Sequence, residues 1–400
     1  SFLLAALLLI GGSVAVGAED MLTTSGGSSS VTDKTIADYK EELESILYSD
    51  YMRDFKSYQR ATESVVIDAV SDLDESQTDV KWLTDEQWKE IISNSSQTAN
   101  NKGLYITEFD GQKALYTPGD GKVTFTKSGI KEGLYSIRIV YYPVEGKAAS
   151  IEREFYINGS APFKEARSLT LPKVWSNTYR TGEYKVPAKK SAEEYLNRAK
   201  AMGLTAVTES REDGTYLVID MPTYWTSDIS AFLIDELKVR FITTDKDRNE
   251  LRPQAVQKPE WCVYDLRDSQ GYYAESFECI ISPDEEGNVS FTLKGVNEPM
   301  AVAQIILMPH EDLMTYDEYI KQYENEPAGT GSIKLEAEYN SSSSTDAVYP
   351  VEDRASAATS PSDTSRVVLN TIGGEKWQTS GQSVTYRFRV PTSGLYTIDM

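Results

Sequence analysis

The chain has 400 residues, of which 40% are hydrophobic and 26% are charged, a composition that is ordinary for globular domains. Its 62 acidic and 40 basic side chains give a formal net charge of −22. Because this charge repels phosphate backbones and anionic lipid headgroups alike, nucleic acid and membrane surfaces are poor candidate partners.

An apolar run followed by small residues fills positions 1–18, ahead of Glu19. This pattern is typical of the later part of a secretory signal peptide, so we expect residues 1–18 to be its remnant and the protein to be extracellular. An uncleaved membrane anchor is the alternative, although the run lies at the short limit for crossing a bilayer. Residues 19–35 form a Ser/Gly-rich linker with no apolar surface to bury.

Three segments carry helical signals. Residues 36–58 place apolar side chains at helical spacing, with charges on the opposite face. Two capping boxes, Thr84 with Gln87 and Thr315 with Glu318, mark the starts of two further helices.

The rest of the core region has the pattern of β structure. Short alternating or aromatic-rich segments, separated by turn residues, predict strands near 65–70, 123–127, 134–142, 151–157, 261–266, 276–281, 289–293 and 301–307. Spacing of this kind favours an antiparallel β-sandwich, so we expect a mainly β fold.

Residues 182–240 depart from this pattern. Ser191 and Glu194 form a capping box ahead of a helix, and Asp213-Gly214 is the turn of a hairpin. We interpret the segment as a small αβ insertion between two strands of the first sandwich. A separate small domain is the alternative.

An internal repeat indicates two copies of one module. Residues 116–135 and 377–396 align at a constant offset, and both end in Gly-Leu-Tyr. The expected organisation is a first module at 36–323, a linker at 324–332 and a second, truncated module at 333–400.

Cys262 and Cys279 lie on two strand-like runs that a hairpin folded near Gly271 would place opposite each other. Because export permits oxidation, we expect a cross-strand disulfide, with two free buried thiols as the alternative. We expect no zinc site, because zinc needs clustered ligands at characteristic spacings and His310, the only histidine, is distant from both cysteines in the sequence.

The residues that catalysis would need are scarce. We interpret His310 as a surface loop residue, and the sequence contains no phosphate-binding Gly-rich loop or Cys/His cluster. We therefore expect the chain not to be an enzyme.

Carbohydrate binding is better supported, because 25 tyrosines and 6 tryptophans offer flat rings on which the C–H faces of sugars can stack. The candidate ligand-binding residues are Trp175, Trp261, Tyr272, Tyr273 and Asp268. The alternative for each aromatic ring is packing within the core or along a strand.

Three carboxylates on the opening strands of the two modules, Asp68, Glu336 and Glu338, are candidate ligands for a structural Ca²⁺. The alternative is that they lie on a solvated strand edge. The sequence implies no other cofactor.

Several motifs resemble one group of secreted proteins. They are Glu132 to Ile137, Tyr141 to Lys147, Ser150 to Glu154, Pro162 to Arg167, Val174-Trp175, Arg252-Pro253-Gln254, Asp268 to Tyr273, Asn297 to Ala301 and Asn370 to Gly374. These runs resemble the long extracellular solute-binding proteins (family 1) of ABC-type sugar transporters, which carry galactose-binding-like sandwiches.

The resemblance implies galactose-binding-like jelly-roll modules that bind an oligo- or polysaccharide without catalysis. It also implies a partner, the membrane permease of an ABC transporter, reached through a downstream domain. The insertion at 182–240 and the lack of a lipid-attachment cysteine depart from the family pattern. A structural spacer without sugar binding, or an accessory module of a secreted glycoside hydrolase, are the alternatives.

Overall fold

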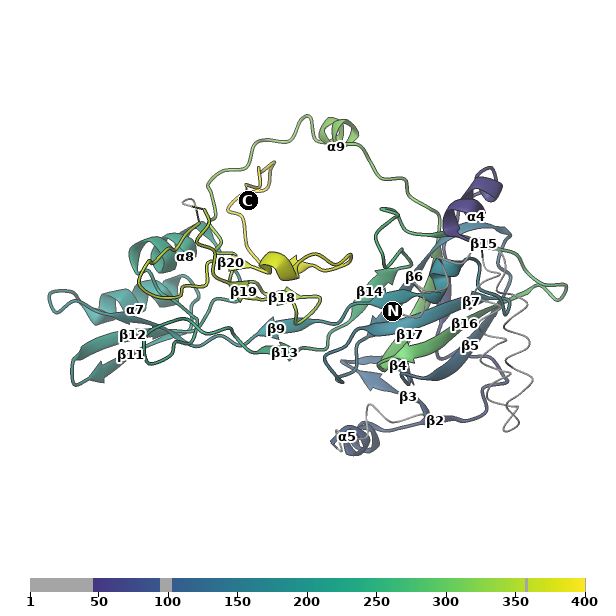
Figure 1. Cartoon of the computed structure of the whole chain (residues 1–400), viewed down its shortest axis with the longest axis horizontal. Coiled ribbons are helices and arrows are strands. Elements are labelled where there is room, and N and C mark those ends of the chain that lie inside the picture. Colours follow the sequence, from purple (N-terminus) through teal and green to yellow (C-terminus); the bar gives the residue numbers. More distant parts are fainter. Residues whose placement is uncertain (1–45, 94–102, 357–358, 400) are drawn as a thin grey trace, which may run out of the picture. The chain divides into compact units, whose positions relative to one another are not determined.

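The computed structural model describes residues 46–93, 103–356 and 359–399 (Figure 1). The chain divides into two compact units, and the second, Tyr48–Met400, contains every described helix and strand. The predicted signal remnant at 1–18, the linker at 19–35 and the start of the predicted helix at 36–58 lie outside the described residues.

The larger sheet has eight strands. Its main path is β14 (Cys262–Asp265), β6 (Gly133–Tyr142), β17 (Met300–Met308), β4 (Gln112–Thr117), β3 (Leu104–Phe109) and β2 (Val80–Trp82), while β1 (Val65–Asp68) pairs with β17 and β15 (Glu278–Ile281) with β6. All pairs are antiparallel except β2 with β3.

A second antiparallel sheet contains β5 (Gly121–Ser128), β16 (Asn288–Asn297), β7 (Ile151–Ile157) and β8 (Leu169–Leu171). Every second residue of β7 is buried, so one of its faces is turned to the core. Phe125, Phe155 and Phe291 from this sheet share one hydrophobic core with Ile137 and Ile305 from the larger sheet. The mainly β, antiparallel architecture expected from the strand pattern is therefore confirmed, in a sandwich-like arrangement (Figure 1).

Helix α4 (Tyr48–Phe55) covers the edge of this core. The Tyr48 ring centroid lies 4.8 Å from that of Phe163 and 4.6 Å from that of Phe277. The hydroxyls of Tyr48 and Tyr51 accept hydrogen bonds from the backbone N–H groups of Glu278 and Ile280 on β15. The aromatic side chains on the apolar face of α4 are thus packed against the core, and their hydroxyls also accept hydrogen bonds from backbone N–H groups of β15.

The capping boxes start helices as predicted. Thr84 and Gln87 exchange side-chain-to-backbone hydrogen bonds ahead of α5 (Asp85–Ser93), and Thr315 and Glu318 do the same ahead of α9 (Tyr316–Gln322). The Ser191 hydroxyl accepts from the Glu194 N–H and begins α7 (Ala192–Ala201).

A second hydrophobic core draws on two segments of the chain. The first segment supplies β10 (Gly182–Lys185), α7, β11 (Ala206–Arg211), β12 (Gly214–Ile219), α8 (Ser227–Ser230) and the π-helix η2 (Ala231–Glu236). Its Tyr195, Leu217 and Phe232 are buried together with Tyr339 and Leu369 from the second segment.

The predicted boundaries assign 182–240 and 333–400 to different modules, and residues of both segments contribute to this core. The physical reason is that one helix and one small sheet leave an apolar face exposed, and residues 333–369 cover it. The predicted hairpin itself is present, with β11 and β12 paired from Ala206–Ile219 to Arg211–Gly214.

The remaining strands are short. They are β13 (Ala255–Gln257), β9 (Trp175–Asn177), β18 (Ser342–Ser343) and β21 (Val384–Thr385) in one sheet, and β19 (Pro350–Val351) with β20 (Thr371–Ile372) in another; η1 (Lys164–Arg167) and η3 (Gly374–Lys376) are 3-10 turns. Among the described residues of 333–399, no strand is longer than two residues. Strand β18 pairs with β9 and β21, and β19 pairs with β20, so part of this segment extends the short sheet that contains β9.

Candidate functional site: a polar groove beside an exposed tyrosine loop

The loop at 267–276 interrupts an edge strand. Strands β14 and β15 both pair with β6 in the same direction, one after the other, so the chain leaves the sheet after Leu266 and rejoins it at Phe277. The neck is closed by a hydrogen bond from the Phe277 N–H to the Leu266 carbonyl. The predicted hairpin of β14 against β15 is therefore wrong.

The same geometry excludes the predicted disulfide. Cys262 is opposite Tyr141 and Cys279 is opposite Tyr135, so the two cysteines lie six positions apart along β6, about 20 Å at the usual strand rise. A disulfide requires α-carbons within about 7 Å. Both cysteines are free, and Cys279 is buried whereas Cys262 is only partly buried.

Asp268 holds the loop in shape. Its carboxylate is buried and accepts hydrogen bonds from the backbone N–H groups of Gln270, Tyr272 and Tyr273. The Ser269 hydroxyl accepts from the Thr170 N–H and ties the loop to β8. With these bonds the loop presents the Tyr272 side chain to solvent with 84% of its surface exposed.

Gly271 brings the loop against the opposite wall. Its φ is +78°, and a Cβ at this position would lie 2.8 Å from the Ser380 hydroxyl oxygen. Only glycine fits both the left-handed backbone and this close approach.

Beside the loop lies a groove of about 500 Å³, within the size range of small-ligand sites. Hydroxyl and amide side chains dominate its walls, together with a few apolar and charged groups. The lining residues are Ser150, Thr170, Pro172, Val263, Tyr264, Asp265, Arg267, Asp268, Ser269, Ser344, Thr345, Thr379, Ser380, Gly381 and Gln382. We call this feature the polar groove.

Of the three charged residues that line the polar groove, the two carboxylates have partners, whereas the exposed Arg267 side chain makes no ion pair or hydrogen bond with the described residues. Asp265 forms a two-point ion pair with Arg138, at 2.6 and 3.0 Å, and Asp268 is used by the loop backbone. The side chains left to contact a ligand are therefore mostly neutral hydroxyls and amides, which suit a neutral polyol such as a sugar.

Trp175 lies in a small extension of the polar groove. This extension of about 40 Å³ shares Ser150, Ser344 and Thr345 with the groove and adds Lys173, Trp175 and Asp346 to its lining. The Trp175 side chain is 9% exposed, so only an edge of its ring faces the extension.

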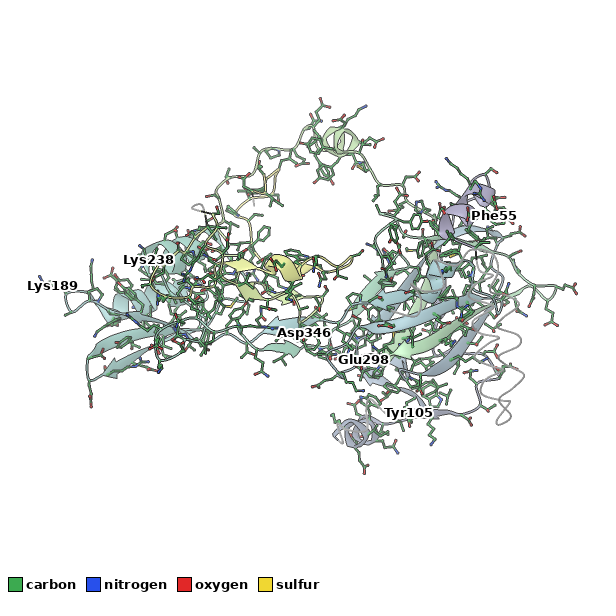
Figure 2. The ribbon with its side chains drawn as sticks, in the orientation of Figure 1. Phe55, Tyr105, Lys189, Lys238, Glu298 and Asp346 are labelled. Atoms are coloured by element: carbon green, nitrogen blue, oxygen red, sulfur yellow. The ribbon has the colours of Figure 1, made fainter. Side chains whose placement is uncertain are left out.

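A buried ion pair supports this end of the groove. The Lys173 ammonium lies 2.7 Å from a Glu298 carboxylate oxygen, and both side chains are almost completely buried (Glu298 and Asp346 are labelled in Figure 2). Glu298 also accepts from the Lys147 N–H. Burial lowers the pKa of Lys173, while the Glu298 carboxylate acts in the opposite direction.

Two of the predicted ligand-binding aromatics have packing roles. Trp261 donates from its indole nitrogen to the Phe109 carbonyl at 3.1 Å and packs against Tyr142. The Tyr273 ring lies edge-on to Tyr48 at 5.1 Å. The structure therefore places Asp268 in the lining of the groove, Trp175 in the lining of its extension and Tyr272 on the loop beside the groove, and it leaves Trp261 and Tyr273 in packing contacts.

The carboxylates considered for calcium are engaged elsewhere. Asp68 accepts from the backbone N–H groups of Val70 and Ser71, and Glu336 pairs with Lys334 at 2.9 Å. In the part of the chain that the structure describes, no group of three or more Asp, Glu, His or Cys residues could hold a metal ion.

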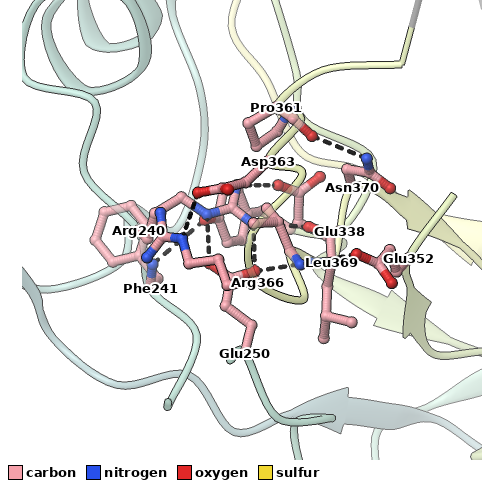
Figure 3. A network of polar contacts seen from close by, with 12 residues as sticks. Arg240, Phe241, Glu250, Glu338, Glu352, Pro361, Asp363, Arg366, Leu369 and Asn370 are labelled. Atoms are coloured by element: carbon pink, nitrogen blue, oxygen red, sulfur yellow. Dashed lines mark hydrogen bonds and ion pairs between the residues drawn. The ribbon is translucent and has the colours of Figure 1, made fainter. Parts of the chain in front are cut away.

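Glu338 is part of a buried charge network that the sequence did not reveal. Arg240 makes two hydrogen bonds of 2.7 Å to Glu250, a third to the Leu369 carbonyl and an ion pair with Glu338 (Figure 3). Because one cation lies between two carboxylates, one negative charge is in excess. Burial raises the pKa of Glu338 to about 7, although Arg240 opposes this shift.

Next to this network is a second cavity, of about 440 Å³, which we call the charged cavity. It is lined by Ile234, Asp235, Lys238, Val239, Arg240, Lys334, Glu336, Tyr339, Ser360, Pro361, Ser362, Asp363, Arg366 and Val368. These residues come from two distant segments, so no sequence motif could have indicated the cavity.

His310 is not the surface residue that we predicted. Its side chain is 3% exposed, with Nδ1 at 2.8 Å from the Ser136 hydroxyl and Nε2 at 3.5 Å from Glu275. The serine–histidine–carboxylate contact resembles a hydrolytic triad, but Ser136 is itself buried inside the sheet. The hydroxyl is therefore out of reach of a substrate.

Comparisons with known proteins add no family. No protein-family model matches the chain, and no curated protein matches it in sequence. Within the described residues, no helix is long and apolar enough to span a membrane.

Proposed function

We infer that the chain is a non-catalytic, carbohydrate-binding region of an exported protein, and that the polar groove is its sugar site. The observation that carries this inference is the juxtaposition of a hydroxyl-rich groove of about 500 Å³ with the exposed Tyr272 ring on a loop fixed by Asp268. Sugars need hydrogen-bonding partners for their hydroxyls and a flat ring for their C–H face, and this arrangement supplies both.

The motif resemblance supports a more specific role. In this role the sandwich-like region is a galactose-binding-like jelly roll. It belongs to an extracellular solute-binding protein and delivers an oligo- or polysaccharide towards the permease of an ABC-type transporter. The many hydroxyl side chains in the lining of the polar groove, together with the amide of Gln382, favour a neutral sugar.

Titration calorimetry of the whole chain against a panel of neutral oligosaccharides tests the sugar site. We expect saturable binding with a Kd in the micromolar to millimolar range, about −4 to −8 kcal/mol. Tyr272→Ala should weaken binding about tenfold, because it removes the stacking ring. Tyr316→Ala is the matched control, since Tyr316 is 75% exposed but lies on α9, a helix that contributes no residue to the groove lining.

A structural spacer is the second candidate. It is favoured by the packing of Trp261 and Tyr273, which leaves two of the predicted aromatics only partly exposed. A folded protein that binds no oligosaccharide of the panel would reject the sugar site and favour the spacer.

A further inference from the structure

The wall of the charged cavity has an unusual backbone. Residues 231–236 form a π-helix, a conformation that is rare and concentrated at functional sites. Lys238 follows with φ +52°, in the left-handed region that costs a non-glycine residue about 1–2 kcal/mol. This conformation places Ile234, Lys238 and Arg240 on one cavity wall.

Two of the three acidic side chains that line the cavity have basic partners. Asp363 pairs with Arg366 Nε at 2.8 Å and Glu336 pairs with Lys334 at 2.9 Å. The pKa of Lys334 is raised chiefly by Glu336, and Asp235 adds to this effect, so Asp235 also acts on Lys334.

Some basic side chains of the cavity, in contrast, have hydrogen-bond donors without a partner in the described chain. Lys238 is exposed at the cavity (labelled in Figure 2), and its ammonium has no partner among the described residues. The ion pair of Arg366 uses Nε, and its terminal amino groups make no hydrogen bond to the described chain. Arg240 cannot contribute, because Glu250, Glu338 and the Leu369 carbonyl occupy it (Figure 3).

We propose that the charged cavity is a second binding site, separate from the polar groove, and that it binds a sugar carrying a carboxylate, a hexuronate. The ammonium of Lys238 and the amino groups of Arg366 bind the carboxylate through charge-assisted hydrogen bonds. Ile234 and Pro361, which are both partly exposed, supply apolar surface for the C–H face of the ring. A volume of about 440 Å³ is within the range of small-ligand sites.

The test compares two sugars that differ only at carbon 6. Galacturonate carries a carboxylate there, and galactose carries a neutral hydroxymethyl group. We expect calorimetry of the whole chain to show galacturonate binding about tenfold tighter or more than galactose, because charge-assisted hydrogen bonds are stronger than neutral ones. Equal affinities, or no heat with either sugar, would overturn the proposal.

Variants assign the site. Lys238→Gln should weaken galacturonate binding about fivefold or more, since it removes the unpaired charge but keeps a hydrogen-bond donor. Lys246→Gln is the matched control, an exposed lysine that does not line the cavity. Arg366→Gln tests the second donor, and circular dichroism confirms that each variant is folded. An unchanged affinity in Lys238→Gln would refute the assignment.

Two further measurements separate this site from others. Tyr272→Ala should leave galacturonate binding unchanged, so failure of the sugar site in the polar groove and failure of the charged cavity give different results. Acetate at the same concentration should not displace galacturonate. If it does, the cavity is a general anion site and the proposed sugar recognition is wrong.

Discussion

Replacing Glu338 by glutamine should change how the stability of the protein depends on pH. The Glu338 side chain is fully buried, and one of its carboxylate oxygens has no hydrogen-bond partner within the described chain. Burial raises its pKa from 4.5 to about 7, although Arg240, which also pairs with Glu250, acts in the opposite direction.

The direction of this pH dependence follows from the number of protons that the folded and the unfolded chain bind. Below pH 4.5 the carboxyl is protonated in both the folded and the unfolded chain. Between pH 4.5 and 7 the unfolded chain releases this proton while the folded chain keeps it, so the stability falls as the pH rises. The shift of the Glu338 pKa is worth about 3 kcal/mol over this window.

Urea unfolding at several pH values between 4.5 and 7.5 measures this effect. Glu338→Gln imitates the protonated carboxyl, so the difference in unfolding free energy between variant and wild type should shift in favour of the variant by about 3 kcal/mol as the pH rises. Glu193→Gln, an exposed position on α7, is the control and should run parallel to wild type. Parallel profiles for Glu338→Gln would refute the reasoning.

Three further predictions concern buried groups. Asp268→Ala removes the acceptor of three loop N–H groups, so urea unfolding should show that the free energy of unfolding falls by about 1–3 kcal/mol. Calorimetry should show that sugar binding in the polar groove is lost. Wild-type values in both measurements would contradict the role of Asp268 in holding the loop. Lys173→Met leaves the Glu298 carboxylate buried without a cation, so the free energy of unfolding in the same assay should fall by about 3–5 kcal/mol. Adding Glu298→Gln should recover part of this loss. A loss below about 1 kcal/mol would show that the ion pair is not needed for stability. Burial raises the pKa of Cys262 to about 11 and that of Cys279 further, so both should react slowly with iodoacetamide at pH 8. Mass spectrometry of the denatured, unreduced chain should find two alkylated thiols, and none would indicate a disulfide.

The local signals in the sequence determined most of the elements. Alternation and β-branched residues located strands such as β7 and β17, and the capping boxes at Thr84 and Thr315 located two helices, because these features depend on residues only a few positions apart. Asp268 and Tyr272 were identified as candidate site residues from the composition of a single loop.

Pairing between distant segments could not be obtained in this way. The two apolar runs on either side of Gly271 predicted a hairpin that would place Cys262 opposite Cys279. In the structure both runs pair with β6 instead, one after the other, and this pairing separates the two cysteines. Likewise, the chain pattern gave His310 a surface position, whereas Ser136 and the sheet around it bury the imidazole.

The charged cavity shows the same limit. Arg240 and Glu338 lie 98 positions apart, and each alone reads as an ordinary surface charge. They are buried only because residues 333–369 cover the apolar face of the segment containing α7 and β12. The sequence by itself determined periodicity, turns and caps, which are local. The tertiary structure decided which faces are covered and therefore which charges are buried, because burial depends on every segment that packs against a residue.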